Sequence, residues 1–144
     1  HRLNGKSVAA TEDSIVRGDT TKTIVQKLRN KGAREVHIFV TFPRIIGPCF
    51  YGVDMATYSE LIGSTHDAEE IARIIGADSV NYQSIERLVE ATGFAKEDLC
   101  LGCITGQYPT PLAQKIADRM KERFLSGHKE TERVYEIEPE ILST

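Results

Sequence analysis

The sequence predicts an α/β fold with a parallel sheet, because segments with strand and helix character alternate along most of its length. Residues 34–42, REVHIFVTF, are β-branched and aromatic, which is typical of a strand. Two stretches, starting near residues 20 and 67, carry aliphatic residues at helical spacing and end at glycines. Strands separated by helices pair in parallel through right-handed crossovers, so we expect a layered sheet with flanking helices.

The first half of the chain begins with a short strand. Residues 6–11, KSVAAT, are small and apolar, as in a buried strand. A helix follows from about residue 20 to residue 31, with an apolar stripe and Gly32 at its C-terminal end. The strong strand at 34–42 then ends at PRIIGP, whose two prolines and glycine interrupt pairing.

Three further helices are marked by their first residues, which are Asp67 with Glu70 as a capping box, Ser84, and Thr110 followed by Pro111. Gly76 and Gly93 end the first two of them. A short strand, residues 78–83, lies between the first and the second. We therefore divide the chain into an α/β part (1–93), a helical part with cysteines (94–126) and a polar tail (127–144).

Composition limits the possible classes of protein. The 144 residues are 40% hydrophobic and 27% charged, with a net charge of −3, which is ordinary for a globular domain. This balance gives no basic surface for nucleic acid, and no apolar run reaches the ~18 residues of a membrane span. We expect a cytoplasmic protein without nucleic-acid or membrane partners. The chain opens near a strand and without Met, and we interpret it as part of a longer polypeptide.

The loop between the first strand and the first helix has the features of an anion site. Backbone N–H groups that curl toward a helix N-terminus attract phosphate, and Gly18 permits a close approach of the ligand. Ser14, Thr20 and Thr21 add hydroxyl donors. The loop matches neither the P-loop pattern nor the dinucleotide fingerprint.

Two carboxylates, Glu12 and Asp13, stand directly before this loop. Carboxylates accept hydrogen bonds from vicinal sugar hydroxyls, hold Mg²⁺ and stabilise positive charge at an anomeric carbon. A sugar phosphate satisfies both the acidic pair and the loop. An ordinary strand–helix turn with solvated acids fits the same residues, and on chemistry alone both interpretations stay open.

The chain has three cysteines, Cys49, Cys100 and Cys103. The last two form a C-x-x-C, a pattern that suits zinc, a redox pair or an iron–sulfur cluster about equally. A cytosolic compartment disfavours disulfides and makes a metal the stronger interpretation. Three unconnected thiols are the alternative.

Three other polar residues are weaker candidates. Arg44 follows the strand at 34–42 and suits either a pyrophosphate contact or a solvated loop charge. Asp54 is better explained by a turn-stabilising role than by ligand contact, and His37 by packing on its strand than by a role as a base.

The segment EDSIVRGDTT, residues 12–21, resembles the signature of type I phosphoribosyltransferases that binds 5-phosphoribosyl 1-pyrophosphate (PRPP). Its middle, DSIVRG, resembles the form found in amidophosphoribosyltransferases. The resemblance covers roughly residues 5–125 and continues in order through GAREVHIFVTFPRI, PCFYGVDM, ELI, EEIARIIGADSVNYQSIERLVEA and LCLGCITGQYP.

The resemblance implies a type I phosphoribosyltransferase-like parallel sheet, present as the C-terminal half of that domain, followed by a helical cysteine-containing segment. It also implies a set of residues that bind the ribose and 5′-phosphate of PRPP: Glu12, Asp13, Ser14, Ile15, Val16, Arg17, Gly18, Asp19, Thr20 and Thr21. The acidic pair would also bind Mg²⁺. No catalytic residue is assigned within this chain.

Some members of the family carry a structural [4Fe–4S] cluster. The resemblance to those members implies that Cys49, Cys100 and Cys103 are three of its four ligands, with the fourth outside this chain. Two departures from the family pattern occur in the loop. Glu12 replaces a more usual aspartate and should keep its role. Asp19 replaces a threonine; it either repels the phosphate or turns outward as a helix N-cap, leaving Thr20 and Thr21 to reach the ligand.

The activity implied is the formation of 5-phosphoribosylamine from PRPP and glutamine-derived ammonia, the first step of de novo purine synthesis. This chain alone is expected to be inactive. Its partners would be the glutaminase domain and the first half of the transferase domain of its own polypeptide, within a homo-oligomer. The alternatives are another PRPP-binding phosphoribosyltransferase or a non-catalytic PRPP-binding regulator.

Overall fold

The structure is a computed structural model and describes residues 3–55 and 57–128. Its sheet has three strands, β1 (Ser7–Glu12), β2 (Glu35–Val40) and β3 (Ser79–Tyr82), in the order β1-β2-β3. Both pairings are parallel, with Ser7 opposite Glu35 and His37 opposite Ser79. The predicted fold class is therefore confirmed, although β2 is shorter than the predicted strand at 34–42.

The helices, in chain order, are α1 (Asp19–Asn30), η1 (Tyr58–Glu60), α2 (Ile62–Thr65), α3 (Ala68–Ile75), α4 (Ile85–Thr92), η2 (Lys96–Asp98), α5 (Gly102–Thr105) and α6 (Pro111–Leu125). The predicted capping box is present at α3: Asp67 Oδ1 accepts from the Glu70 amide at 2.9 Å, and the Asp67 amide donates to Glu70 Oε2 at 3.0 Å. Four short elements, η1, α2, η2 and α5, were not predicted from the sequence, because elements of three or four residues are too short to show a periodic pattern.

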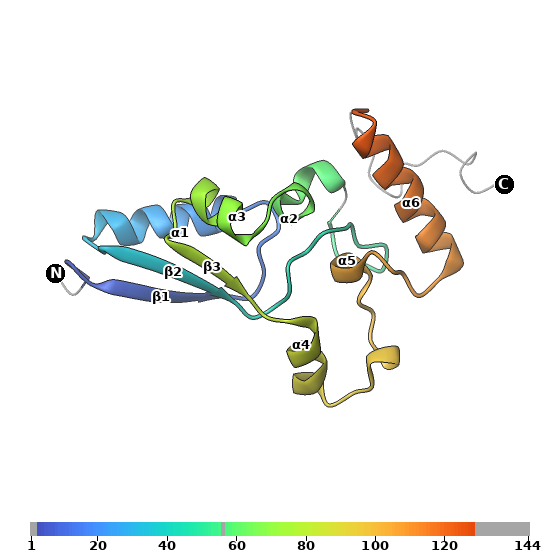
Figure 1. Cartoon of the computed structure of the whole chain (residues 1–144), viewed down its shortest axis with the longest axis horizontal. Coiled ribbons are helices and arrows are strands. Elements are labelled where there is room, and N and C mark those ends of the chain that lie inside the picture. Colours follow the sequence, from blue (N-terminus) through green and yellow to red (C-terminus); the bar gives the residue numbers. More distant parts are fainter. Residues whose placement is uncertain (1–2, 56, 129–144) are drawn as a thin grey trace.

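The main core lies between the sheet and the pair α1 and α3, which cover the same face (Figure 1). Val36, Ile38 and Val40 on β2 point into it and are 0%, 0% and 3% exposed. The alternate residues of β2 point to the other face, where Phe39 is 45% exposed. This period of two is the alternation expected of a strand with one covered face.

A second core cluster holds the C-terminal segment against the loop that follows β2; its buried members are Ile45, Met55, Leu61, Leu101 and Ile104. Tyr108 joins the two segments, since its hydroxyl donates to the Pro48 carbonyl at 2.7 Å. Its ring lies so close to Gly102 that a Cβ on that residue would sit 2.4 Å from the ring. A side chain at position 102 would therefore displace the Tyr108 ring, whose hydroxyl makes the contact with Pro48.

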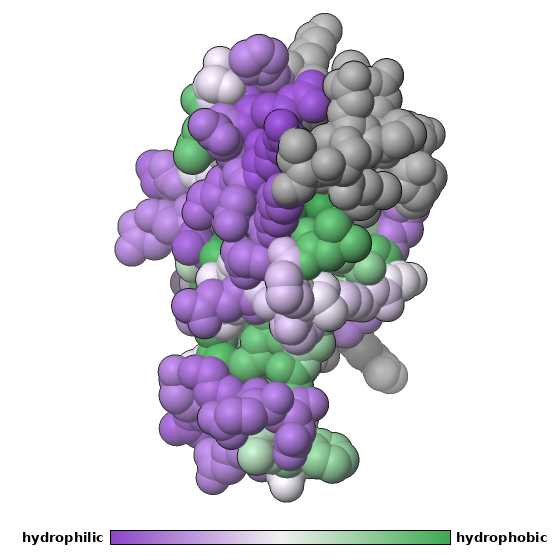
Figure 2. Space-filling view, turned by 90° about the vertical axis from the view of Figure 1, so that its right-hand side faces the viewer, coloured by the Kyte–Doolittle hydropathy of each residue, from purple (hydrophilic) through white to green (hydrophobic). Residues whose placement is uncertain are grey.

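The C-terminal half leaves several large apolar side chains exposed. Seen from the side that carries α6, apolar surface forms a band between more polar parts above and below (Figure 2). Phe94 and Leu125 are 64% and 73% exposed, and α4 has no fully buried residue. Within the described residues, no helix is both long enough and apolar enough to cross a bilayer. Of the predicted polar tail (127–144), residues 129–144 lie outside the described residues.

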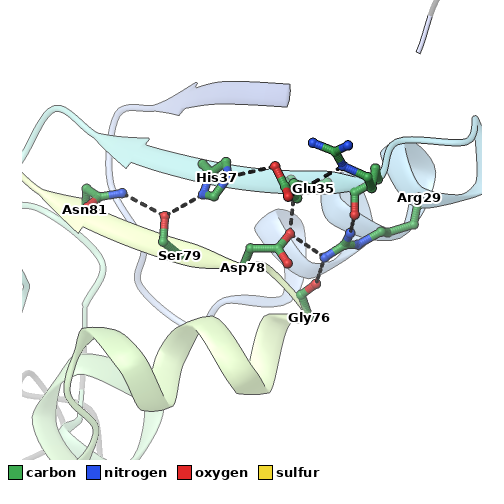
Figure 3. A network of polar contacts seen from close by, with 9 residues as sticks. Arg29, Glu35, His37, Gly76, Asp78, Ser79 and Asn81 are labelled. Atoms are coloured by element: carbon green, nitrogen blue, oxygen red, sulfur yellow. Dashed lines mark hydrogen bonds and ion pairs between the residues drawn. The ribbon is translucent and has the colours of Figure 1, made fainter. Parts of the chain in front are cut away.

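A polar network fastens the amino-terminal edge of the sheet, at the opposite end from the β1–α1 loop (Figure 3). Arg29, near the end of α1, contacts Asp78 Oδ2 at 2.6 Å and the Gly76 carbonyl at 3.3 Å. The same Asp78 oxygen accepts from the Val36 amide at 2.6 Å. On the exposed face, His37 shares a hydrogen bond of 2.9 Å with Ser79, so its contact is with a neighbouring strand, as the sequence favoured.

Asp78→Asn should lower the free energy of unfolding by roughly 1 kcal/mol at pH 7, below the usual value for a charged hydrogen bond because Asp78 and Arg29 are both partly exposed. The Val36 amide and then Arg29 hold the pKa of Asp78 below its usual range. A depressed pKa in the folded state contributes stability above the pKa of the unfolded chain and loses it as pH falls through the folded pKa. Urea unfolding at pH 7 and at about pH 3 measures this, and the gap between the two proteins should shrink at the lower pH. An equal stability at pH 7 would contradict it.

Candidate functional site

The candidate site is a pocket at the carboxyl edge of the sheet, where β1 passes into α1. Its volume is about 390 Å³, and it is lined by Glu12, Asp13, Ser14, Ile15, Val16, Arg17, Gly18, Asp19, Thr20, Thr21 and Asp54. The structure thus brings all ten residues of the predicted binding set to one pocket, together with one residue from a distant loop. Ligands of open α/β sheets bind at this edge of the strands.

The loop reaches the helix through a left-handed residue. Gly18 is the N-cap of α1 with φ of 88°, a backbone conformation that is strained for any residue with a Cβ atom. Its carbonyl accepts the first helical hydrogen bond, from the Lys22 amide at 2.8 Å, and no side chain caps the helix at this residue. The N-terminus of α1 therefore presents backbone N–H groups and the positive end of its dipole to the pocket.

The acidic pair, Glu12 and Asp13, also lines the pocket. Partial burial, and next the neighbouring charge of Asp13, raises the pKa of Glu12. Asp13 is exposed, and its Oδ1 accepts from the Ser14 amide at 2.6 Å. A cation bound beside two adjacent carboxylates would offset the repulsion between their charges. Over residues 3–55 and 57–128, however, no three His, Cys, Asp or Glu side chains are grouped to hold a metal ion.

Of the two alternatives for Asp19, the one that makes it the helix N-cap is wrong. Gly18 occupies the cap, and Asp19 is the first residue of α1, exposed and lining the pocket. Its carboxylate therefore competes with an anionic ligand for the positive end of α1. The two threonines differ, since Thr20 is exposed whereas Thr21 is only 3% exposed and is held in the body of the molecule.

Asp54 is the lining residue that the sequence argument valued too low. It comes from the loop between β2 and η1, and only the folding of that loop over the pocket places it beside residues 12–21. The signal available in the sequence was that Asp54 lies within PCFYGVDM, one of the segments that carry the family resemblance. Arg44 does not line this pocket; it donates to the His66 carbonyl at 2.6 Å, which anchors the loop after β2 to the end of α2.

The cysteines come from two segments that the fold joins. The Cys103 carbonyl accepts hydrogen bonds from the Ile46 and Gly47 amides at 2.8 and 3.0 Å, three and two residues before Cys49. Burial, with smaller contributions from Cys49 and Cys100, raises the pKa of Cys103 to about 11. All three thiols are free, and Cys100 is exposed. The tertiary structure therefore brings the segment of Cys49 against the Cys100–Cys103 segment, which lies 51 residues further along the chain, without grouping the three thiols as a ready metal site among the described residues.

No protein-family model matches the chain. It is 50% identical over 116 residues to an amidophosphoribosyltransferase of Methanothermobacter thermautotrophicus, covering 81% of this chain and 24% of that enzyme. To an amidophosphoribosyltransferase of Methanocaldococcus jannaschii it is 54% identical over 118 residues, covering 81% of this chain and 25% of the relative. The chain therefore spans about a quarter of the length of the curated relatives it matches.

Among solved structures, the chain resembles glutamine PRPP amidotransferase from B. subtilis complexed with ADP and GMP. The TM-score is 0.69 with 47% identity, over 75% of this chain and 25% of the other. A structure described as the allosteric regulatory enzyme of purine biosynthesis gives a TM-score of 0.68 with 46% identity, covering 75% and 24% of the two chains.

The parallel sheet with its pocket after β1 belongs to the phosphoribosyltransferase class of α/β folds. Within that class, the chain is a homologue of one segment of the amidophosphoribosyltransferases.

Proposed function

We propose that this chain supplies the PRPP-binding loop of an amidophosphoribosyltransferase, which forms 5-phosphoribosylamine from PRPP and glutamine-derived ammonia at the start of purine synthesis. The observation that carries the proposal is the pocket itself. One short loop brings an acidic pair and an uncapped helix N-terminus to the same cavity, which matches a ligand that is part polyol and part phosphate. Relatives at 50% and 54% identity that are named for this activity support it.

In this proposal the backbone N–H groups of residues 15–21 hold the 5′-phosphate at the start of α1. Glu12 and Asp13 accept hydrogen bonds from the ribose hydroxyls, and they hold Mg²⁺ together with oxygens of the substrate. A site that shares its ions with substrate phosphates needs few protein ligands. In the reaction the C1–O bond to pyrophosphate breaks, the nitrogen of ammonia bonds to C1, and the amine then loses a proton.

The experiment is turnover by the full-length protein that contains this chain. Purified protein with Mg²⁺, PRPP and glutamine should release pyrophosphate and glutamate in equal amounts. PRPP binding without turnover would instead mark a non-catalytic PRPP-binding protein, and turnover with a nucleobase in place of glutamine would mark a different phosphoribosyltransferase. Absence of PRPP binding would overturn the proposal.

We include in the proposal a structural [4Fe–4S] cluster that takes the three thiols as ligands and a fourth ligand from outside this chain. The donor chemistry supports it, since cysteine thiolates are the usual ligands of such clusters, and a bound metal compensates the charge that burial disfavours on Cys103. When bound, the cluster would tie the C-terminal segment to the loop before η1. Cys49, Cys100 and Cys103 would hold it.

Two further parts of the proposal concern the whole protein: that it is cytoplasmic, and that it is a homo-oligomer. Sedimentation of the purified full-length protein tests the oligomeric state, and a monomer at micromolar concentration would contradict it.

Asp19→Thr should tighten PRPP binding by about threefold to tenfold in the full-length protein. The substitution removes a carboxylate from the first turn of α1, where it faces the anion, and introduces a hydroxyl donor. Isothermal titration with PRPP and Mg²⁺ measures the change, which should diminish as salt is raised. Unchanged affinity would mean that Asp19 turns away from the bound phosphate.

A further inference from the structure

The charges around the pocket are unbalanced for a site that binds an anion. Among its described lining residues, four are acidic, Glu12, Asp13, Asp19 and Asp54, and one is basic, Arg17. Backbone N–H groups offset part of this excess. Arg17 is therefore the one positively charged side chain among these lining residues, and the direction in which its guanidinium points matters more than it would in a site with several basic residues.

Arg17 is held in place by a residue 43 positions away. Its Nη2 contacts Glu60 Oε1 at 2.6 Å. Glu60 is itself oriented by Thr57, whose hydroxyl donates to Oε2 at 3.2 Å. Thr57 is only 6% exposed, so the hydroxyl that orients Glu60 is held within the body of the molecule.

The backbone of the loop is attached to the same segment. The Ile62 amide donates to the Val16 carbonyl at 2.9 Å. The Ile62 side chain also packs beneath Gly18, where an added Cβ would lie 3.2 Å from Ile62 Cδ1. Residues 57–62 thus contact the loop by an ion pair, a backbone hydrogen bond and a packing contact, which is more than a solitary surface ion pair.

We propose that Glu60 is a positioning residue that orients Arg17 toward the phosphate of PRPP. The inference rests on the proposed function of this pocket and adds a role for a residue outside it. A guanidinium has five N–H donors. With one terminal nitrogen committed to Glu60, the remaining donors form a fixed fork for a ligand oxygen. Without Glu60, Arg17 must lose the freedom of a long side chain each time the ligand binds.

Glu60→Gln in the full-length protein should raise KM for PRPP about fivefold and change kcat by less than about twofold, because the loss falls on binding. Thr57→Val, which leaves the charge of Glu60 but removes its orienting hydroxyl, should raise KM by a smaller factor. In an Arg17→Gln background, Glu60→Gln should have no additional effect, since a residue that acts through Arg17 cannot act when Arg17 is absent.

Arg34→Gln is the matched control. It breaks a surface ion pair of similar kind, to Glu35 at 3.5 Å, outside the pocket lining, and should leave KM unchanged. If the wild-type protein binds no PRPP, the proposed function fails. If the wild type works and Glu60→Gln has a normal or lower KM, the positioning role alone is overturned. Additive effects of the two substitutions would overturn it as well.

Discussion

Asp13→Asn is expected to lower kcat/KM for PRPP by at least about 100-fold in the full-length protein. Asparagine keeps the size of the side chain and an oxygen that can accept from the Ser14 amide, so the local loop should survive. It loses the negative charge, which the proposed Mg²⁺ and ribose contacts both need. An exposed position makes a folding defect a poor explanation for such a loss.

The measurement is steady-state kinetics with PRPP varied at several Mg²⁺ concentrations. If Asp13 helps to hold the ion, excess Mg²⁺ should recover part of the activity. Glu90→Gln, which neutralises an exposed acid on α4 outside the pocket lining, is the matched control and should be indistinguishable from wild type. If Asp13→Asn had wild-type kinetics, the proposed role of the acidic pair in binding PRPP and Mg²⁺ would be contradicted.

Cys100→Ser is expected to abolish the iron content of the full-length protein purified without oxygen. The wild type should carry about four irons and four sulfides per chain, with a broad visible absorption, and the variant close to none. A serine oxygen is a much poorer ligand for a cluster than a thiolate. Because Cys100 is exposed, the substitution itself should disturb packing little, so the loss would report on ligation.

Gln107→Ser, at an exposed position of the same segment, is the control and should keep its iron. Zinc in place of iron in the wild-type protein would assign the thiols to a different structural metal. A wild-type protein with no metal, or a Cys100→Ser variant that keeps its iron, would overturn the proposed cluster.

The elements with many residues could be predicted because each carries its pattern locally. Burial alternates along β2, and the caps at Asp67, Ser84 and Thr110 are the first residues that the structure also uses. The one-turn elements could not be predicted, since α2 and α5 are held by contacts to distant segments rather than by their own periodicity. The cap of α1 could not be predicted either, because Asp19 has the side-chain chemistry of an N-cap, whereas in the structure Gly18 occupies that position.

By itself, the sequence determined that ten consecutive residues, 12–21, lie together between a strand and a helix, because a strand-to-helix turn brings near neighbours together wherever it occurs. Only the tertiary structure decided which distant side chains join them. Asp54 reaches the pocket and Glu60 reaches Arg17 because the chain after β2 folds back over the carboxyl edge of the sheet. Such contacts depend on how loops pack on a common core, and no local pattern encodes a partner 43 residues away.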